Sequence, residues 1–342
     1  MNIRNAAALM IVLSLSVVTL ILGQRLLIPL IFALLIWLLV RKIKSKLNQI
    51  PFIRHWFPGW VTNIIMSGLI FAAFTFIGRL LAVNIEILAK SYETYGVNVT
   101  IVTNDINKIF NIDTMKLLEE YAGNFNFGTL FSSIFSSLRG MVENTIVVLL
   151  YVVFIFLEES NFPVKLHGIF PRTQRYLRVL VLIQKIEKSV ANYIGLKTLV
   201  NLISAVISFI VLLIIGVDTP IFWAFLVFLL NFIPLIGLFI SVLLPAAFCL
   251  VQFGSFSPCI ATLISLGTVQ FIVGNILEPR IMGNSLNISP LVAIIALALW
   301  GTIWGITGMF LSVPITVIMI IIFSQFSKTR PIAILLSEKG KI

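Results

Sequence analysis

The stretch that decides the fold is IFWAFLVFLLNFIPLIGLFISVLLPAAFCLVQF, residues 221–253. It is almost wholly apolar, and at about 1.5 Å per residue one helix of this length would exceed a hydrocarbon core of about 30 Å. Asn231, Pro234 and Gly237 interrupt it, and the proline frees backbone groups that need partners in protein or water. We therefore predict a helical hairpin with a broken tip at membrane depth; two tight, complete spans are the alternative.

A second apolar region, residues 288–326, is built in the same way, with a break at GTIWGITG. Its GMFLSV (308–313) resembles the GLFISV (237–242) of the first region, and a proline follows each copy shortly afterwards, Pro314 and Pro245. Six apolar residues can agree by chance, but both copies come just after a break. Paired segments interrupted by glycine and proline indicate the substrate site of a secondary transporter. We predict a second re-entrant hairpin here.

The composition is that of an integral membrane protein. Of 342 residues, 59% are hydrophobic and 11% charged, and the mean hydropathy is +1.10, whereas about 25% of residues are charged in globular proteins. A net charge of +11 would suggest nucleic acid in a soluble protein. Here the basic residues cluster beside the apolar runs, as the positive-inside rule expects, so we predict no nucleic-acid partner.

Five full spans are predicted in addition to the hairpins. Residues 6–40 break around Gly23 into two spans, and the others are predicted at 60–83, 141–157 and 190–215. One further span, 259–277, lies between the two hairpins. The fold class is therefore an all-α polytopic membrane protein.

Charge patterns divide the chain into domains. Five basic residues without an acid follow the second span (Arg41, Lys42, Lys44, Lys46 and Arg54), which makes that loop cytoplasmic. Both termini are then cytoplasmic, and the two hairpins enter from opposite faces. The predicted domains are N-terminal spans with a basic loop (1–83), an extracytoplasmic amphipathic insert (84–140), a span with a basic interfacial helix (141–190), a transport core (191–327) and a cytoplasmic tail (328–342).

Two amphipathic helices are predicted outside the spans. In the insert, the apolar residues between Ile112 and Phe125 recur at helical spacing, which suits either a small packed cap or a binding domain. After Pro171, apolar residues recur at helical spacing with basic residues on the other face, and we expect an interfacial helix or a contact with anionic lipid.

A polar stripe marks the last of the five spans. Lys197, Asn201, Ser204 and Ser208 recur at spacings of four, three and four, and so share one helical face. Serines alone are common in helix packing. Ionisable and amide groups inside a span usually face a bundle interior or a water-filled cavity, so the stripe favours a lined cavity.

The decapeptide GNILEPRIMG, residues 274–283, carries two of the three charged residues found between Thr198 and Ser327. Gln270 and Gly274 lie on the face that leads to Glu278. We expect Pro279 to end the helix, leaving Glu278 and Arg280 at a broken end. Either the two form a structural ion pair, or the carboxylate binds a proton or sodium ion while Arg280 engages substrate oxygens or keeps Glu278 ionised.

These patterns give a candidate site for transport and none for catalysis. No phosphate loop, HExxH or GxSxG motif occurs, and the two cysteines lie far from both histidines in sequence, so we predict no enzyme, cofactor or metal. A transporter of a small polar molecule, a cation/proton antiporter, a channel and a scaffold remain open. The predicted substrate or ion path is Lys197, Asn201, Ser204, Asn231, Pro234, Gly237, Gln270, Asn275, Glu278, Arg280 and Ser312. The predicted hinge or structural residues are Pro245, Pro279, Gly283, Gly308 and Pro314.

Three motifs, NFIPLIG (231–237), GNILEPRIMG (274–283) and GMFLSVP (308–314), closely resemble the bacterial autoinducer-2 exporter family of permeases. The resemblance covers the whole chain and is most specific at the Glu-Pro-Arg sequence. Leu238 and Ala246 depart from the family pattern, which bears on the substrate more than on the fold.

This resemblance implies an inner-membrane transporter, some of whose relatives export the quorum-sensing signal autoinducer-2 while others are associated with sodium/proton exchange. It also implies a homo-oligomer in the lipid bilayer with an elevator-like transport domain. The expected partners are accordingly a small-molecule substrate and Na⁺ or H⁺.

Overall fold

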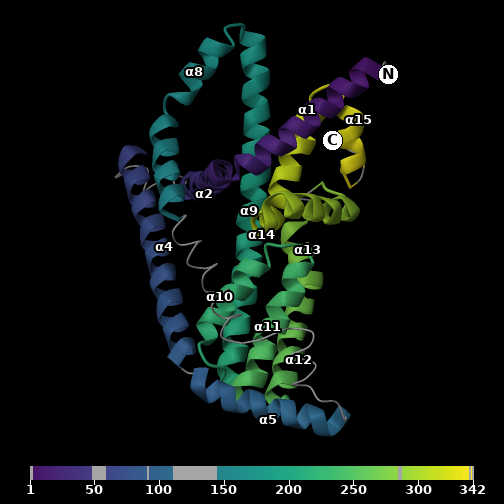
Figure 1. Cartoon of the computed structure of the whole chain (residues 1–342). Helices are drawn as coiled ribbons and strands as arrows, with labels where there is room; N and C mark the ends of the chain where they lie inside the picture. The colour runs from purple at the N-terminus through teal and green to yellow at the C-terminus, as the bar shows by residue number, and fades with distance from the viewer. Residues whose placement is uncertain are drawn as a thin grey trace. The chain divides into compact units, whose positions relative to one another are not determined.

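The computed structural model describes residues 3–47, 59–90, 92–110, 145–283, 287–338 and 340. Within these residues the chain is helical and contains no β-strand, which confirms the all-α polytopic prediction (Figure 1). Six of the described helices are long and apolar enough to cross a membrane. A seventh span results if the helix Thr145–Glu158 and α8 (Phe162–Ile169), bent by 69° to one another, cross as a pair.

The chain divides into two compact units. Unit 1 comprises Met1–Phe71, Asn144–Leu196 and Met282–Ile342, and unit 2 comprises Ala72–Glu143 and Lys197–Ile281. This division rests on which residues contact one another within each unit. It does not test on which side of the membrane a segment lies, so the domains assigned from charge stay predictions.

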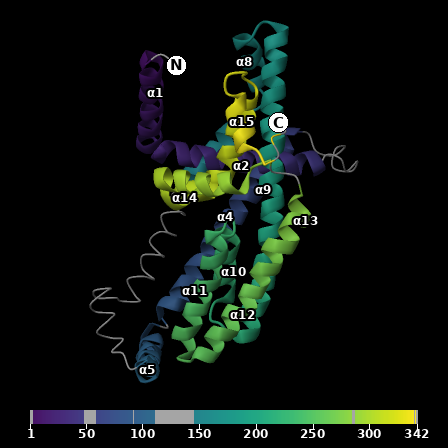
Figure 2. The same cartoon turned by 90° about the vertical axis from the view of Figure 1, so that its right-hand side faces the viewer.

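In unit 1, α1 (Ile3–Leu22) and α2 (Gln24–Leu47) are separated by Gly23, as predicted. Figure 2 shows the chain turning sharply between them. A side chain at Gly23 would place a Cβ 2.8 Å from the carbonyl oxygen of Thr19. The tight turn therefore requires glycine at this position.

The second broken region is α14 (Pro290–Ser324) of unit 1. Its helix is interrupted at Trp304 and at Gly305, which has φ 62° and ψ −143°. A Cβ on Gly308 would lie 1.8 Å from the carbonyl oxygen of Trp300, so the chain after the break folds back onto the chain before it. The break is confirmed. The short helix α15 (Arg330–Leu336) packs on α14.

The predicted basic amphipathic helix and the span that follows it are not divided by a break. Both lie in one continuous helix, α9 (Thr173–Ile215), of 43 residues. Its length is about 64 Å, more than twice a hydrocarbon core. The segment contains no proline and one glycine, Gly195. A change from basic to apolar composition does not by itself end a helix, because the backbone hydrogen bonds continue through it.

Unit 2 holds the first broken hairpin. Helices α10 (Pro220–Leu230) and α11 (Ile236–Phe253) pack against each other across a break in which Leu235 has φ 61°. A Cβ on Gly237 would lie 1.8 Å from the carbonyl oxygen of Leu230. In unit 1, a Cβ on Gly308 would lie at the same distance from the preceding arm of its own hairpin. In both copies of the sequence repeat, the glycine therefore allows the two arms to approach closely.

The other helices of unit 2 frame this hairpin. They include α5 (Tyr92–Phe110), which packs on α11, and the part of α4 (Gly59–Lys90) that follows Phe71. The whole of α4 contains the predicted span 60–83. The predicted amphipathic helix between Ile112 and Phe125 lies outside the described residues.

The predicted span at 259–277 extends further than expected. It consists of α12 (Phe256–Ile272), the π-helical turn η1 (Val273–Leu277) and α13 (Glu278–Met282), which together form one candidate span. The prediction that Pro279 ends the helix is wrong. In η1 the Glu278 N–H donates to the carbonyl oxygen of Val273, five residues earlier, and this wider turn accommodates the proline ring. The helix ends instead at Gly283, which has φ +47°.

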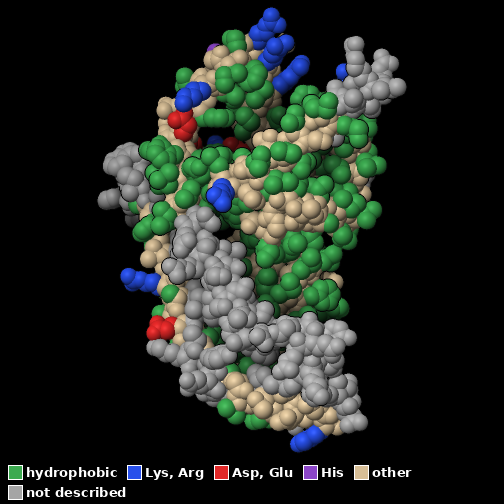
Figure 3. Space-filling view, viewed as in Figure 1, with side chains coloured by type: hydrophobic (Ala, Val, Ile, Leu, Met, Phe, Trp, Pro, Cys, Tyr) green, Lys and Arg blue, Asp and Glu red, His purple; other side chains and the backbone are tan. Residues whose placement is uncertain are grey.

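Large hydrophobic side chains cover the outside of the helices (Figure 3). On unit 2, Ile214 of α9 is 79% exposed, and Ile264 and Phe271 of α12 are 61% and 64% exposed. Contiguous apolar surface of this kind is costly in water and is expected where helices face lipid.

Candidate functional site

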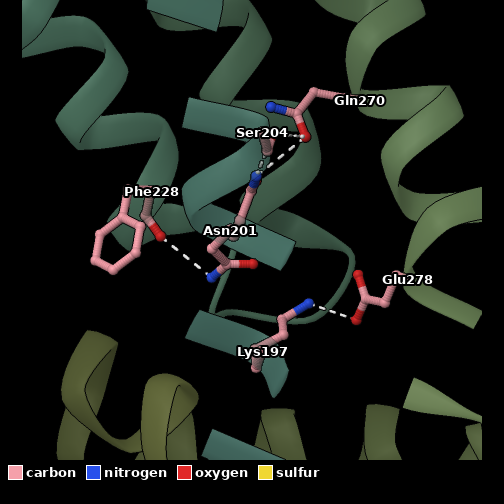
Figure 4. Close-up of polar contacts among 7 residues, drawn as sticks. Lys197, Asn201, Ser204, Phe228, Gln270 and Glu278 are labelled. Atoms are coloured by element: carbon pink, nitrogen blue, oxygen red, sulfur yellow. Dashed lines mark hydrogen bonds and ion pairs between the residues drawn. The ribbon is translucent and has the colours of Figure 1, made fainter. Parts of the chain in front are cut away.

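The polar stripe of α9 points into unit 2. Lys197 and Asn201 are 7% and 1% exposed, and Ser204 and Ser208 are fully buried. A buried polar group is costly unless it finds a partner. The partners come from the α10–α11 hairpin and from α12 with its extension, which lie beside this face of α9 (Figure 4).

Asn231, Ser204 and Gln270 form the centre of the site. The Nδ2 of Asn231 donates to Ser204 Oγ and to Gln270 Oε1, each at 3.1 Å, and Ser204 Oγ lies 3.3 Å from the same Gln270 oxygen. Asn231 is the residue at which α10 ends. The break in the hairpin therefore brings an amide side chain between two continuous helices.

Three polar atoms at this centre find no hydrogen-bond partner among the described residues. They are Asn231 Oδ1, Gln270 Nε2 and Ser208 Oγ, an acceptor, a donor and a hydroxyl. Buried polar atoms in folded proteins are nearly always paired with protein or water. The site can therefore offer a donor and an acceptor to water or to a small polar molecule.

Asn201 holds the end of the short helix α10. Its Nδ2 donates to the carbonyl oxygen of Phe228 at 3.2 Å. The last carbonyl groups of a helix have no partner within that helix, so a side-chain donor here stabilises the break. The sequence analysis did not predict this role for the Phe228 carbonyl. Its position just before the break at Asn231 and Pro234 could have indicated a carbonyl that needs a partner.

The site ends in an ion pair between α9 and α13. Lys197 Nζ lies 2.5 Å from Glu278 Oε1, with the two side chains 9% and 27% exposed. Among the described residues, the ion-pair partner of Glu278 is thus Lys197, whereas the sequence had suggested Arg280. Arg280 is exposed.

The π-helical turn places Glu278 in this pair. In a regular α-helix, eight residues turn through about 800°, so Glu278 would lie about 80° around the axis from Gln270. The wider turn at Val273–Leu277 takes up an extra residue and reduces this offset. Gln270 and Glu278 can then both face α9.

We call Lys197, Asn201, Ser204, Asn231, Gln270 and Glu278 the polar cluster. All six belong to unit 2. Pro234 lies in the break of the hairpin, and Gly237 makes its close approach to the preceding arm. Pro245 and Pro314 lie buried inside α11 and α14.

Besides Pro234 and Gly237, three predicted path residues lie outside the cluster: Asn275, Arg280 and Ser312. Asn275 is exposed, and its Nδ2 donates within its own helix to the carbonyl oxygen of Phe271 at 3.0 Å. Ser312 belongs to unit 1, where its Oγ donates to the carbonyl oxygen of Met309 at 2.7 Å. Ser241 makes the matching contact with Leu238 in the first repeat, at 2.9 Å. These bonds are local helix contacts.

The described residues include no group of three or more His, Cys, Asp or Glu side chains that could hold a metal ion. The polar cluster combines one positive and one negative side chain with neutral amide and hydroxyl groups. Its chemistry is that of hydrogen-bond recognition.

Comparison with known proteins identifies the family. The sequence model of the AI-2E family transporters matches residues 9–328. The AI-2 transport protein TqsA of Escherichia coli (strain K12) is 34% identical over 213 residues, which cover 62% of this chain and 61% of TqsA. The chain thus aligns with about three fifths of the length of TqsA.

Two further relatives are each named "Putative transport protein". The one from Borreliella burgdorferi is 28% identical over 256 residues, covering 74% of this chain and 70% of its own length. The one from Haemophilus influenzae is 27% identical over 324 residues, covering 93% and 91%. All three relatives carry names of transport proteins. With a match that extends over nearly the whole chain and helices long enough to span a membrane, this protein is a membrane transporter of the AI-2E family.

Proposed function

We propose that the protein exports a small polar molecule such as autoinducer-2 across the bacterial inner membrane, and that the polar cluster is its substrate site. The observation that carries the proposal is that Asn231 Oδ1, an acceptor at the break of the hairpin, and Gln270 Nε2, a donor on the adjoining α12, are both buried without a hydrogen-bond partner among the described residues. Broken helices at the centre of secondary transporters commonly form substrate sites. The printed name of TqsA supports autoinducer-2 as the substrate.

The proposed transport cycle is alternating access of the elevator type in a homo-oligomer, with both termini in the cytoplasm. The two broken hairpins support this cycle, since repeats of this kind occur in carriers that expose one site to each side in turn. The Lys197–Glu278 pair closes one end of the cluster. Coupling to Na⁺ or H⁺ would act on this pair, because binding of a cation or proton to the carboxylate competes with the lysine.

Flux in proteoliposomes tests the proposal. Replacing Asn231 with leucine removes both the donor and the acceptor at similar size, and we expect autoinducer-2 flux to fall at least about tenfold, the effect of losing a buried hydrogen bond or two. Asn275→Leu makes the same change at an exposed position outside the cluster. This control should keep nearly normal flux.

Normal flux in Asn231→Leu would contradict the proposal that the polar cluster is part of the transport path. Sodium-driven proton movement by the wild type, without autoinducer-2 flux, would instead support a cation/proton antiporter with Glu278 as the carrier. Flux of autoinducer-2 that needs no ion gradient would exclude obligatory coupling.

A further inference from the structure

Helix α5 is joined to the base of the α10–α11 hairpin by polar contacts. Tyr95 Oη donates to Asp218 Oδ2 at 2.7 Å, and Asn98 Nδ2 donates to the carbonyl oxygen of Gln252 at 2.6 Å. Asp218 lies just before α10 and Gln252 in the last turn of α11. In Figure 1, α5 lies across this end of unit 2.

Gln252 also ties the two feet of the hairpin to each other. Its Oε1 accepts from the backbone N–H of Asp218 at 2.8 Å, and its Nε2 donates to the carbonyl oxygen of Gly216 at 2.9 Å. We call Tyr95, Asn98, Asp218 and Gln252 the clasp. Because the Gln252 side chain joins the α11 foot to the segment before α10, and α5 bonds each foot, the hairpin base and α5 are held as one assembly.

The backbone beside the clasp is in a disfavoured conformation. Thr219, the residue before α10, has φ 50° and ψ 52°, in the left-handed region that a β-branched residue rarely adopts. Its buried Oγ1 has no hydrogen-bond partner among the described residues. Such conformations persist where the surroundings enforce them, and they are frequent at segments that switch. The clasp is the surrounding structure that holds this residue.

An apolar layer separates the clasp from the polar cluster. On α9, Leu212 lies one turn beyond Ser208 and one turn before Gly216, and on α12 Leu266 lies one turn before Gln270; both are fully buried. Trp223 and Phe248 belong to the same buried group. The ring of Tyr95 packs edge-on against Phe248, with centroids 5.4 Å apart. Tyr95 therefore holds the layer with its ring and the hairpin foot with its hydroxyl.

We propose that α5 is a latch: the clasp must open to let the hairpin base move and the polar cluster exchange its contents through this end of unit 2. This inference rests on the proposed function of the cluster. It makes Tyr95, Asp218 and Gln252 positioning residues that act through the hairpin. If α5 were only a permanent cap, fixing it to α11 would leave transport unchanged.

A disulfide can make that distinction. An ideal Cβ on Gly254 lies 3.4 Å from the Cβ of Asn98, close to the separation in natural disulfides. Asn98→Cys with Gly254→Cys, in a background with Cys249→Ala and Cys259→Ala, should crosslink α5 to the end of α11. We expect autoinducer-2 flux to fall at least about tenfold on oxidation and to return on reduction, as for a step blocked by a covalent link.

The controls separate this inference from the proposed function. Each single-cysteine variant should transport equally with and without oxidant. Flux in the reduced double variant supports the proposed function by itself, and flux that persists after complete crosslinking overturns the latch. Failure of the pair to crosslink would contradict the closed clasp on which the latch depends.

A second measurement does not depend on transport. Tyr95→Phe keeps the ring contact with Phe248 and removes only the hydroxyl that binds Asp218. In a Cys259→Ala background, the buried native Cys249 then reports opening through its reaction with a water-soluble maleimide. We expect labelling to rise about tenfold, because a hydrogen bond to a charged group is lost. Tyr176→Phe, the same change in unit 1, should not alter the rate, and an equal rate in both variants would contradict the latch.

Discussion

At the scale of single residues, the site depends on side chains that satisfy one another inside a membrane protein. Lys197 and Glu278 are each costly to bury alone, and they are tolerated because each neutralises the other. Asn231 and Gln270 hydrogen-bond to each other and to Ser204, but Asn231 Oδ1 and Gln270 Nε2 have no partner among the described residues. The capacity that remains supports the proposal that the cluster binds a ligand, because buried polar atoms are nearly always paired.

Removing one member of the ion pair should destabilise the protein more than removing both. Glu278→Gln leaves a buried lysine without a counter-charge, at a cost of about 2–3 kcal/mol in the free energy of unfolding, since Glu278 is partly exposed. The double variant with Lys197→Met contains no unpaired charge and should recover most of this loss. Thermal unfolding of the purified variants in detergent measures both. A double variant as unstable as the single one would show that the pair does not control stability.

At the scale of elements, each broken hairpin depends on a glycine that lets one arm reach the other. Gly237 and Gly308 occupy equivalent places in the two repeats, and a Cβ on either would overlap a carbonyl oxygen of the preceding arm. Proline marks both regions in the sequence, but the close approach of the arms requires the glycines.

Gly237→Ala should therefore destabilise unit 2. The added methyl group forces the arms of the hairpin apart, with an expected loss of about 1–3 kcal/mol. Gly267→Ala is the matched control, because a Cβ there meets nothing within 4 Å and alanine favours the helix interior. Midpoints of thermal unfolding should fall for the first variant and stay equal or rise for the second. Equal midpoints in both variants would mean that the arms of the hairpin can move apart without a loss of stability.

The sequence predicted the elements best where chemistry and structure are local. Asparagine, proline and glycine predicted the first break, the glycines of GTIWGITG predicted the second, and the spacing of four polar residues predicted a shared face of α9. The pairing of Lys197 with Glu278 joins residues 81 positions apart, and no local pattern indicates it. The passage of the helix through Pro279 depends on a bond from Glu278 to Val273 in a π-helical turn, while proline usually indicates a helix end.

At the scale of the whole molecule, the proposed topology makes the C-terminal tail cytoplasmic and α5 extracytoplasmic. In a background with Cys249→Ala and Cys259→Ala, Gly340→Cys should react with an impermeant maleimide only after the membrane is opened. Asn104→Cys, at an exposed position of α5, should react in intact cells. The reverse pattern would invert the topology derived from the basic loop.

The neutrality of the polar cluster has an energetic consequence for movement across the membrane. One elementary charge that crosses a potential of 100 mV changes its energy by about 2.3 kcal/mol. Because Lys197 and Glu278 cancel each other, a body that carries them through the membrane with an uncharged substrate moves no net charge. In a cycle without a coupled cation, the resting voltage of the cell would then neither drive nor oppose the movement, and the substrate gradient would set the direction of flow.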